Sequence, residues 1–388
     1  MASIVQRNKS FSVVYSIYDG DKKKQKWETY HSYKEALHRK EQVEIIYQKK
    51  QLKYRSGTLA QFLDEYVELY GHIHWACSTY SSNTALIRNY IIPFFGTLQL
   101  HEFSPKVIAV VYSQLQRNLK ITPQLMNNIH KLLHSAFEQA VLWEYLDYNP
   151  FKKANIPKIY SQEITMLSLD QIRILLQNCT EPTLTLAVHL AFSGSLRKGE
   201  ILALTWDDID FGKGTVSVSK SLKRIRKDAV QVLNGKDILY QFPAVFDEGR
   251  TVVVLKRPKT HASVRTVYLP EYVMNLLWNV KKEQRALKRG IPDLVLRYGN
   301  GRPLQEETLP RLLEKQLLAL GFPKVTFHSL RHSSITYKLI LTGGNIKAVQ
   351  GDSGHAQAEM ITERYGHIID SCRKQCAQDF EEDFYKSL

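Results

Sequence analysis

The spacing of hydrophobic and polar positions changes along the chain and divides it into three parts. Residues Phe11 to Tyr18 alternate as in a strand, Asp19-Gly20 supplies a turn, and Trp27 to Tyr33 resumes a strand-like run. Ser32 and Glu35 then have the spacing of a capping box, which predicts a helix immediately afterwards. We therefore expect the first part to be a small β-sheet with one face covered by a helix.

From Thr58 the apolar positions recur at steps of three and four, as on one face of a helix. Three more helices are expected over 81–90, 105–118 and 123–142, with breaks at Pro93 to Thr97 and at Lys120 to Thr122. This second part ends at Asn149-Pro150 and the basic stretch 152–158, where Pro157 makes a continued helix unfavourable. We expect this part to be an all-helical domain.

The third part contains both the alternation typical of strands and the three-to-four-residue spacing typical of helices, and helical spacing predominates. It opens with Ser168 and Gln171, a second capping-box spacing. The expected helices cover 184–192, 197–204, 270–288, 306–320, 328–341 and 345–352, and the expected strands cover 214–219, 251–255 and 263–269. The predicted class is therefore α+β multidomain: a sheet-plus-helix domain at 1–57, an all-helical domain at 58–157, and a mostly helical domain with a small antiparallel sheet at 158–388.

Charge adds a candidate partner to this picture. The 388 residues carry a formal net charge of +15, and residues 1–57 alone have 13 Lys and Arg against 6 Asp and Glu. The stretch 213–236 has seven Lys and Arg and one Asp. Solvated lysine-rich faces are one explanation, and binding to a polyanion with release of its counterions is the other. Nucleic acid is the leading candidate partner.

The four cysteines form no CxxC pair and no dense framework, which argues against a secreted disulfide scaffold. The first ten residues contain no apolar signal region, and no run of about 18 uncharged apolar residues occurs. We expect a cytoplasmic protein that does not interact with membranes.

Several basic residues of the third part lie in contexts that suit phosphate chemistry. Arg197 begins a short helix, where it is most simply a surface residue or a partner of Glu200. Lys259 lies in a basic turn between two expected strands. His328 and Arg331 are three residues apart at the start of a helix, so they share one face of it, after Thr326 as a plausible cap.

The last candidates lie near the C-terminus. His328 and His332 have the four-residue spacing of a zinc-binding helix, yet Ser329 stands where a metalloprotease has its glutamate, so no metal is expected. Gly354-His355 follows at a helix end, and Tyr365 comes ten residues later. Core packing does not generate the order Arg, Lys, His-x-x-Arg, His, Tyr.

Because all of these residues are present in this order, the chain resembles the tyrosine recombinases of the integrase family, such as those of temperate phages and conjugative transposons. The motifs that carry the resemblance are Arg197-x-x-Glu200, His328-x-x-Arg331-His332 and Gly354-His355 with Tyr365. The resemblance spans nearly the full length, and makes 1–57 an arm-site DNA-binding domain, 58–157 a core-binding domain and 158–388 the catalytic domain. The long basic segment 220–250 departs from the compact hairpin of the family.

The resemblance implies a role for each residue type. Tyr365 would be the nucleophile on a DNA phosphodiester, Arg197 and Arg331 would clamp the non-bridging oxygens, and Lys259 would be the general acid. His328 would accept the proton of the tyrosine, and His355 would hydrogen-bond the phosphate. Glu200 and His332 would orient these groups. The expected DNA contacts are Lys22, Lys23, Lys24, Lys26, Lys223, Arg224, Arg226 and Lys227. No cofactor, metal or ATP is expected, because the phosphotyrosine preserves the bond energy.

The implied activity is integration and excision of a mobile element through a 3′-phosphotyrosyl intermediate and a Holliday junction. The implied partners are double-stranded DNA at attachment or transposon-end sites, further copies of the chain in a tetramer, an excisionase and DNA-bending proteins, in a bacterial cytoplasm and on the nucleoid. A type IB topoisomerase and a non-catalytic DNA-binding regulator are the alternatives. The apolar stripe of the tail 370–388 is expected to pack either on its own domain or on a neighbouring protomer.

Overall fold

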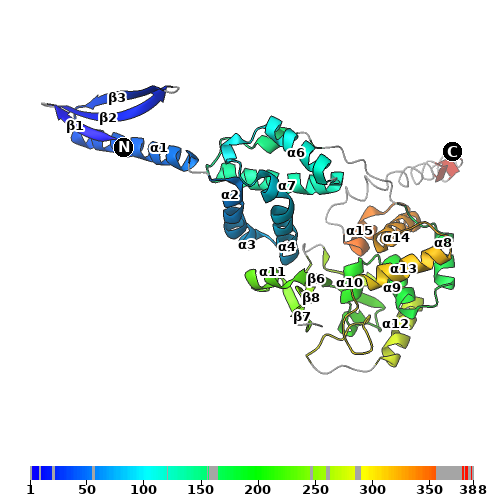
Figure 1. Ribbon diagram of the computed structural model, residues 1–388. Helices are drawn as coiled ribbons and strands as arrows, with labels where there is room; N and C mark the ends of the chain where they lie inside the picture. The colour runs from blue at the N-terminus through cyan, green and yellow to red at the C-terminus, as the bar shows by residue number, and fades with distance from the viewer. Residues whose placement is uncertain are drawn as a thin grey trace. The chain divides into compact units, whose positions relative to one another are not determined.

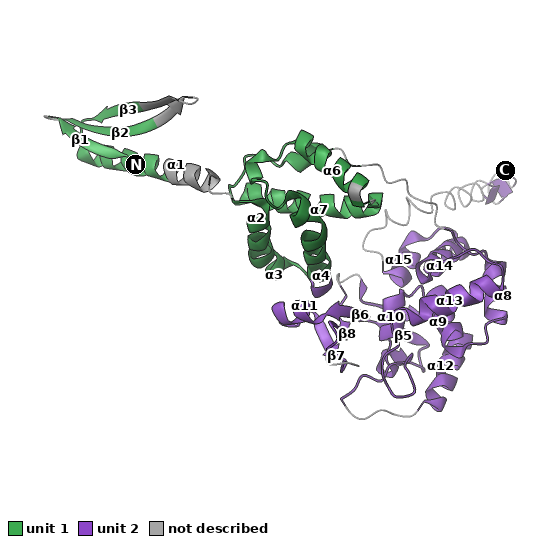
Figure 2. Ribbon diagram, in the orientation of Figure 1, with its two compact units in different colours: residues 1–75, 79–160 green, residues 76–78, 161–388 purple. Residues whose placement is uncertain are grey.

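The computed structural model describes most of the chain. The described residues are 2–7, 10–19, 22–54, 57–119, 121–154, 156, 165–244, 248–258, 263–284, 290–354, 378–379, 381–382 and 386. For 17–19, 22–24, 46–54 and 118 only the backbone is described. The chain divides into two compact units, residues 1–75 with 79–160 and residues 76–78 with 161–388 (Figure 2).

The first unit begins with an antiparallel sheet in the order β1-β2-β3. Its strands are β1 (Ser3–Arg7), β2 (Ser10–Asp19) and β3 (Lys22–Tyr30), and α1 (Tyr33–Tyr54) lies along one face (Figure 1). Val13 and Tyr15 of the sheet pack with Ala36 and Val43 of the helix. The sequence reading missed β1, because Ile4 and Val5 are adjacent and give no alternation.

The remainder of the first unit is helical, as its apolar period predicts. Its elements are α2 (Leu59–Glu65), the π-helix η1 (Tyr66–Gly71), α3 (His72–His74), α4 (Cys77–Leu86), the π-helix η2 (Ile87–Ile91), α5 (Ile92–Phe95), η3 (Leu100–Glu102), α6 (Pro105–Leu119), α7 (Pro123–Leu142) and η4 (Pro150–Lys153). An aromatic cluster occupies the core, where the Phe62 and Phe137 ring centroids lie 6.4 Å apart.

The break expected at Pro93 to Thr97 begins later than predicted, because the helix continues across Pro93 as α5 and ends at Phe95. Proline removes one helical N–H and crowds the preceding turn. The wider π-turns of η2 come directly before it, and Ile92 donates its N–H to Ile87 O, five residues back. A local change of helical pitch thus accommodates the proline without ending the helix.

The second unit is built around α9 (Pro182–Phe192), which packs against α10, α12, α13 and α14. Leu190, Ala187 and Val188 of α9 are fully buried, as its uniformly apolar sequence predicts. The other helices of this unit are α8 (Leu169–Gln177), α10 (Lys198–Ala203), η5 (Trp206–Asp208), α11 (Lys227–Val232), α12 (Glu271–Glu283), α13 (Thr308–Ala319), α14 (Phe327–Leu341) and α15 (Ile346–Ser353). The capping box predicted at Ser168 is present, with Gln171 N donating to Ser168 Oγ at 3.2 Å.

The second unit contains two antiparallel three-stranded sheets among its described residues, where we expected one small sheet. The first has the order β4-β5-β9, from β4 (Ile209–Asp210), β5 (Thr215–Val218) and β9 (Arg265–Tyr268). The second has the order β6-β8-β7, from β6 (Ser221–Arg226), β7 (Ile238–Gln241) and β8 (Thr251–Lys256). The basic segment 220–250 therefore supplies two strands and α11 (Figure 1).

No helix in the described ranges is both long enough and apolar enough to cross a bilayer.

Candidate functional site

Arg197 caps α10 and is held by the carboxylate one turn ahead of it. Glu200 Oε2 accepts the backbone N–H of Arg197 at 2.8 Å, and Glu200 Oε1 accepts from Arg197 Nη1 at 2.9 Å. The Arg197 side chain remains 37% exposed, whereas that of Glu200 is 7% exposed. The carboxylate is thus a buried anchor for a guanidinium that reaches the surface.

Gly199 explains how this short helix lies so close to β6. A Cβ at position 199 would lie 2.5 Å from Ser221 Oγ and 3.2 Å from the carbonyl oxygen of Leu222. Only glycine therefore allows this approach without a shift of the neighbours. The packing places Arg197 and Glu200 at the edge of the core.

A second arginine, Arg265 of β9, binds the same carboxylate from the core side. Its Nη2 donates to Glu200 Oε2 at 2.8 Å and its Nη1 to Oε1 at 3.2 Å. Burial alone would raise the pKa of Glu200, but the hydrogen bonds and charge of Arg265, followed by those of Arg197, outweigh it and lower the pKa. Glu200 is therefore a carboxylate in the folded protein, shared between two guanidiniums.

Arg331 of α14 is completely buried. Its Nη1 donates to the carbonyl oxygen of Ser195 and its Nη2 to that of Ser353. Ser195 adopts a positive φ of 52°, which is uncommon for a residue with a side chain. Its hydroxyl lies 2.6 Å from the hydroxyl of Ser334, so two residues of α14 hold the turn that leads to Arg197.

The three arginines converge on the last turn of α15. Arg265 Nε donates to Asp352 O at 2.7 Å, Arg331 Nη2 to Ser353 O, and Arg197 Nη2 to Gly354 O at 3.4 Å. Gly354 ends the helix in the left-handed conformation with a φ of 60°. Positive groups favour the carbonyl end of a helix, so the cluster both ends α15 and is stabilised by it.

The predicted histidines lie together in the first turns of α14. His328 is exposed and His332 is 2% exposed, and their ring centroids are 4.3 Å apart with an interplanar angle of 76°. Thr326 and Ser329 form a capping box at the helix start, as Ser329 N donates to Thr326 Oγ1 at 3.2 Å. Ser329, which broke the zinc-helix pattern, is thus used in the cap.

Three predicted catalytic residues, Lys259, His355 and Tyr365, lie outside the described residues, as does most of the tail. The structure brings together Arg197, Glu200 and Arg331 through the end of α15, next in the chain to His355. The two strands that flank Lys259 were both expected, and the structure places them in different sheets, β8 in one and β9 in the other.

The predicted DNA contacts divide by environment. Lys26 forms an ion pair of 3.0 Å with Glu28, and of the neighbouring Lys22, Lys23 and Lys24 only the backbone in β3 is described. Lys223 and Arg224 are exposed on β6. Arg226 is paired with Asp228 through contacts of 3.0 and 3.1 Å from its Nε, and Lys227 is half-buried.

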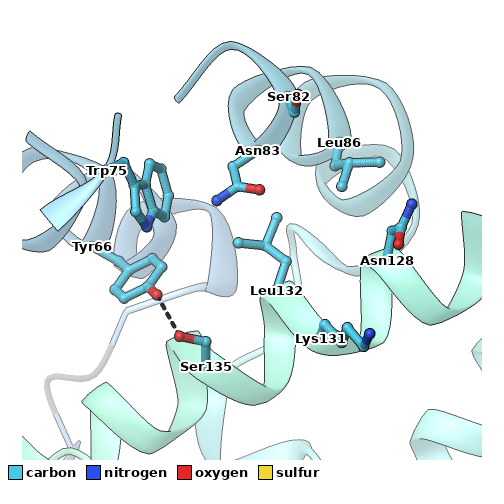
Figure 3. A pocket seen from close by; sticks show the side chains of 9 residues that line it. All are labelled: Tyr66, Trp75, Ser82, Asn83, Leu86, Asn128, Lys131, Leu132 and Ser135. Carbon is cyan, nitrogen blue, oxygen red and sulfur yellow. Dashed lines mark hydrogen bonds between the residues drawn. The ribbon is translucent and has the colours of Figure 1, made fainter. Parts of the chain in front are cut away.

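The helical part of the first unit has a cavity of about 300 Å³ between α4 and α7 (Figure 3). Tyr66, Asn83, Asn128 and Lys131 are among its lining residues, and the Tyr66 hydroxyl lies 2.9 Å from Ser135 Oγ. None of the predicted catalytic residues lines it. Within the described ranges, no group of three or more His, Cys, Asp or Glu side chains is arranged to hold a metal ion.

The sequence reading missed Arg265 and the pair of Ser195 and Ser334. Arg265 had a usable signal, because it shares the buried face of β9 with Val267, and an arginine at a buried position of a strand requires a partner. Ser195 follows Gly194 in a turn, but no local pattern indicates that Ser334 lies opposite it.

Comparisons with known proteins agree with the motifs. The profile described as the phage integrase family matches residues 165–371, and that of the phage integrase N-terminal SAM-like domain matches residues 58–116. A tyrosine recombinase XerC-like protein of Caldanaerobacter subterraneus subsp. tengcongensis is 28% identical over 276 residues. That alignment covers 66% of this chain and 66% of the relative.

Two solved structures show the same fold. The integrase of transposon Tn1549, in complex with a circular intermediate DNA, superposes with a TM-score of 0.68 at 19% identity, over 83% of this chain and 99% of that one. Lambda integrase, as a tetramer bound to a Holliday junction, gives 0.55 at 18% identity, over 92% and 96%. The predicted α+β multidomain class is confirmed.

Proposed function

We propose that this chain, which belongs to the phage integrase family of tyrosine recombinases, cuts and rejoins DNA at specific sites to integrate and excise a mobile element. The observation that carries the proposal is the convergence of Arg197 and Arg331 on the end of α15, directly before His355 in a region that matches the family. Tn1549 integrase, a transposon enzyme, has the same fold.

In the proposed reaction, Tyr365 attacks the scissile phosphodiester and forms a 3′-phosphotyrosyl bond, while the 5′ oxygen leaves. A phenol has a pKa near 10, so its proton must be removed during attack, which we assign to His328. Lys259 protonates the leaving 5′ oxygen and His355 hydrogen-bonds the phosphate. A 5′ hydroxyl from a second duplex then reverses the step, which conserves the bond energy and requires neither ATP nor a metal ion.

Arg197 and Arg331 differ in their exposure and internal contacts before DNA binds. Arg197 is partly exposed and already oriented by Glu200, so it can bind a non-bridging oxygen directly. Arg331 is buried and bound to two carbonyl oxygens, so contact with DNA requires it to be uncovered. Binding of the phosphate therefore includes a local rearrangement around Arg331.

Strand exchange requires four active sites, and we propose a tetramer on DNA, in a bacterial cytoplasm, with an excisionase and DNA-bending proteins as accessory factors. The lambda integrase tetramer on a Holliday junction supports this assembly. Matches to recombinases favour exchange between sites over the relaxation of supercoils by a type IB topoisomerase.

The variant Tyr365→Phe tests the nucleophile. Sequencing the junctions left when the flanking element excises supplies the DNA site. On that DNA the variant should bind with an unchanged Kd and form no covalent adduct in a denaturing gel. Tyr268→Phe, at an exposed tyrosine of β9, is the matched control and should form adducts normally. An adduct that survives in Tyr365→Phe refutes the assignment, and two marked duplexes that relax without recombining indicate a topoisomerase.

The exposed pair Lys223 and Arg224 is proposed to contact DNA phosphates, together with the basic N-terminal domain. Replacing both residues by alanine should reduce the slope of log K against log salt by roughly 2, since each phosphate contact contributes about 0.9. Arg226→Ala, at a position already paired with Asp228, should change the slope less. Equal slopes for wild type and the double variant would remove β6 from the DNA interface.

A further inference from the structure

We propose that Arg265 is a positioning residue of strand cleavage: it holds Glu200 from the core side and thereby directs Arg197 toward the scissile phosphate. The inference rests on the proposed function, since it concerns the same phosphate site. It assigns to a buried arginine a role that the six predicted catalytic residues do not include.

The contacts of Arg265 indicate that it acts through another residue. Its side chain is 5% exposed and forms a two-pronged pair with a carboxylate, whereas Arg331 donates to backbone carbonyls, so release of Arg265 to DNA would leave the charge of Glu200 without this partner. All three of its nitrogens are bonded within the protein: Nε to Asp352 O at 2.7 Å, Nη1 to Ser263 O at 3.1 Å and to Glu200, and Nη2 to Glu200. A guanidinium with this many internal partners is fixed in place.

The stability of the fold alone does not account for a charge at this position. Two ions taken out of water lose hydration that their mutual attraction only partly restores, and apolar side chains of the same volume are often as stable. The pair of Arg265 with Glu200 is followed by a further contact from Glu200 to Arg197. The charge of Arg265 keeps Glu200 ionised and so able to hold Arg197.

The hydrogen bonds at Glu200 explain how Arg265 affects the orientation of the Arg197 side chain. Each carboxylate oxygen accepts one bond from Arg265 and one from Arg197, at distances between 2.8 and 3.2 Å. The planar fork of Arg265 matches both oxygens at once and fixes the plane of the carboxylate. Arg197, with a flexible and partly exposed side chain, then has one preferred direction before DNA binds.

The hydrogen bond from Arg265 Nε also fixes the position of the end of α15. Arg265 binds Asp352 O, and Lys338 of α14 binds the Asp352 carboxylate at 2.6 Å. The end of α15 is thus held in register with Glu200, and the chain leads from there to His355. One buried side chain sets the relative position of the Arg197 anchor and the helix end before His355.

The test measures the single-turnover cleavage rate at saturating DNA, together with the Kd for DNA, for the full-length chain. Arg265→Met should slow cleavage about 100-fold and change Kd by less than about threefold. Arg265→Lys should recover about tenfold of the loss, because an ammonium keeps the charge but not the two-pronged contact. Arg302→Met, at an exposed arginine, is the matched control and should cleave at the wild-type rate.

A double-mutant cycle with Glu200→Gln separates positioning from general stabilisation. If Arg265 acts through Glu200, the double variant should cleave no more slowly than the slower single variant. Losses that multiply, or an Arg265→Met rate within threefold of wild type, would overturn the inference. If Arg265→Met does not fold, Arg265→Lys replaces it in the cycle with Glu200→Gln, and the double variant is again compared with the slower single variant. Failure of the proposed function is a separate result, since it appears as an adduct in Tyr365→Phe.

Discussion

The two units of the molecule bury their polar groups in opposite ways. In the described part of the first unit, the buried polar side chains are Ser12, His130 and Asn149. Among the described residues of the second unit, by contrast, buried residues with formal charge include Glu200, Lys256, Arg265 and Arg331. Since burial of a charge is costly without close partners, its concentration in one unit indicates where the fold serves chemistry as well as stability.

Burial in the helical part suppresses ionisation. It raises the pKa of Tyr66 to about 12, even though a hydrogen bond with Ser135 acts in the opposite direction. Burial also lowers the pKa of His130, whose Nδ1 lies 3.0 Å from the Tyr112 hydroxyl. Burial thus favours the neutral form of these groups, whereas the neighbouring arginines favour the charged form of Glu200. A tyrosine suited to nucleophilic attack needs the second kind of environment.

The largest expected effect tests this contrast at Arg331. Arg331→Met leaves the carbonyl oxygens of Ser195 and Ser353 without a donor, at a cost of about 1–3 kcal/mol each. The cleavage rate should fall by roughly 10²–10³, as for one lost donor to a transition-state anion. Single-turnover cleavage and denaturant unfolding are the measurements.

The control for that experiment lies in the other unit. Tyr112→Phe removes one buried hydrogen bond to His130 and should cost about 1 kcal/mol in stability with cleavage unchanged. The contrast between the units breaks down if the two variants lose cleavage to the same degree.

A smaller effect is expected at Gly199, where packing positions the charged cluster. In Gly199→Ala the new methyl group presses on Ser221, which can rotate, and on the carbonyl of Leu222, which cannot. We expect a loss of about 1 kcal/mol in stability and a several-fold slower cleavage, measured by denaturant midpoint and single-turnover rate.

Gly299→Ala is the matched control, because nothing lies within 4 Å of a Cβ there. Wild-type cleavage by Gly199→Ala would show that α10 can move away from β6 without misdirecting Arg197.

The smallest expected effect is a dependence of the first unit on pH. Burial, and then the nearby His134, lower the pKa of His130. An unfolded histidine binds a proton at about pH 6.5, and the folded chain binds it only at a lower pH, so this contribution to stability is complete above the unfolded pKa and declines as the pH falls below it. Unfolding of His130→Gln by denaturant between pH 5 and 8 should show a shallower decline than the wild type. Identical declines would mean that His130 is not the group responsible.

Local signals in the sequence predicted much of the fold. The capping box at Ser168, the helix cap at Thr326 and the uniform apolar run of α9 depend on near neighbours, and all three appear as expected. The break predicted from Pro93 begins only after Phe95, since the π-turns that accommodate the proline have no sequence signature. The second sheet was missed because pairing of β6 and β7 with β8 is a property of distant segments.

The candidate site was predictable in its residue types and unpredictable in its connections. Spacing singled out Arg197, Glu200 and Arg331, but the bridge through Arg265 joins residues 65 positions apart. The burial of Arg331 also depends on contacts 136 and 22 positions away. The catalytic roles, the domain limits and the DNA contacts stay predictions for the variants above to test.

The left-handed turn at Ser195 has a consequence for the newly made protein. A residue with a side chain leaves this conformation unless its surroundings enforce it, and the enforcing groups, Arg331 and Ser334, are synthesised more than 130 residues later. Until α14 docks, a nascent or partly unfolded chain lacks the groups that hold the turn before Arg197. The turn that leads into α10 is therefore completed only late in synthesis, once the C-terminal half of the second unit is present.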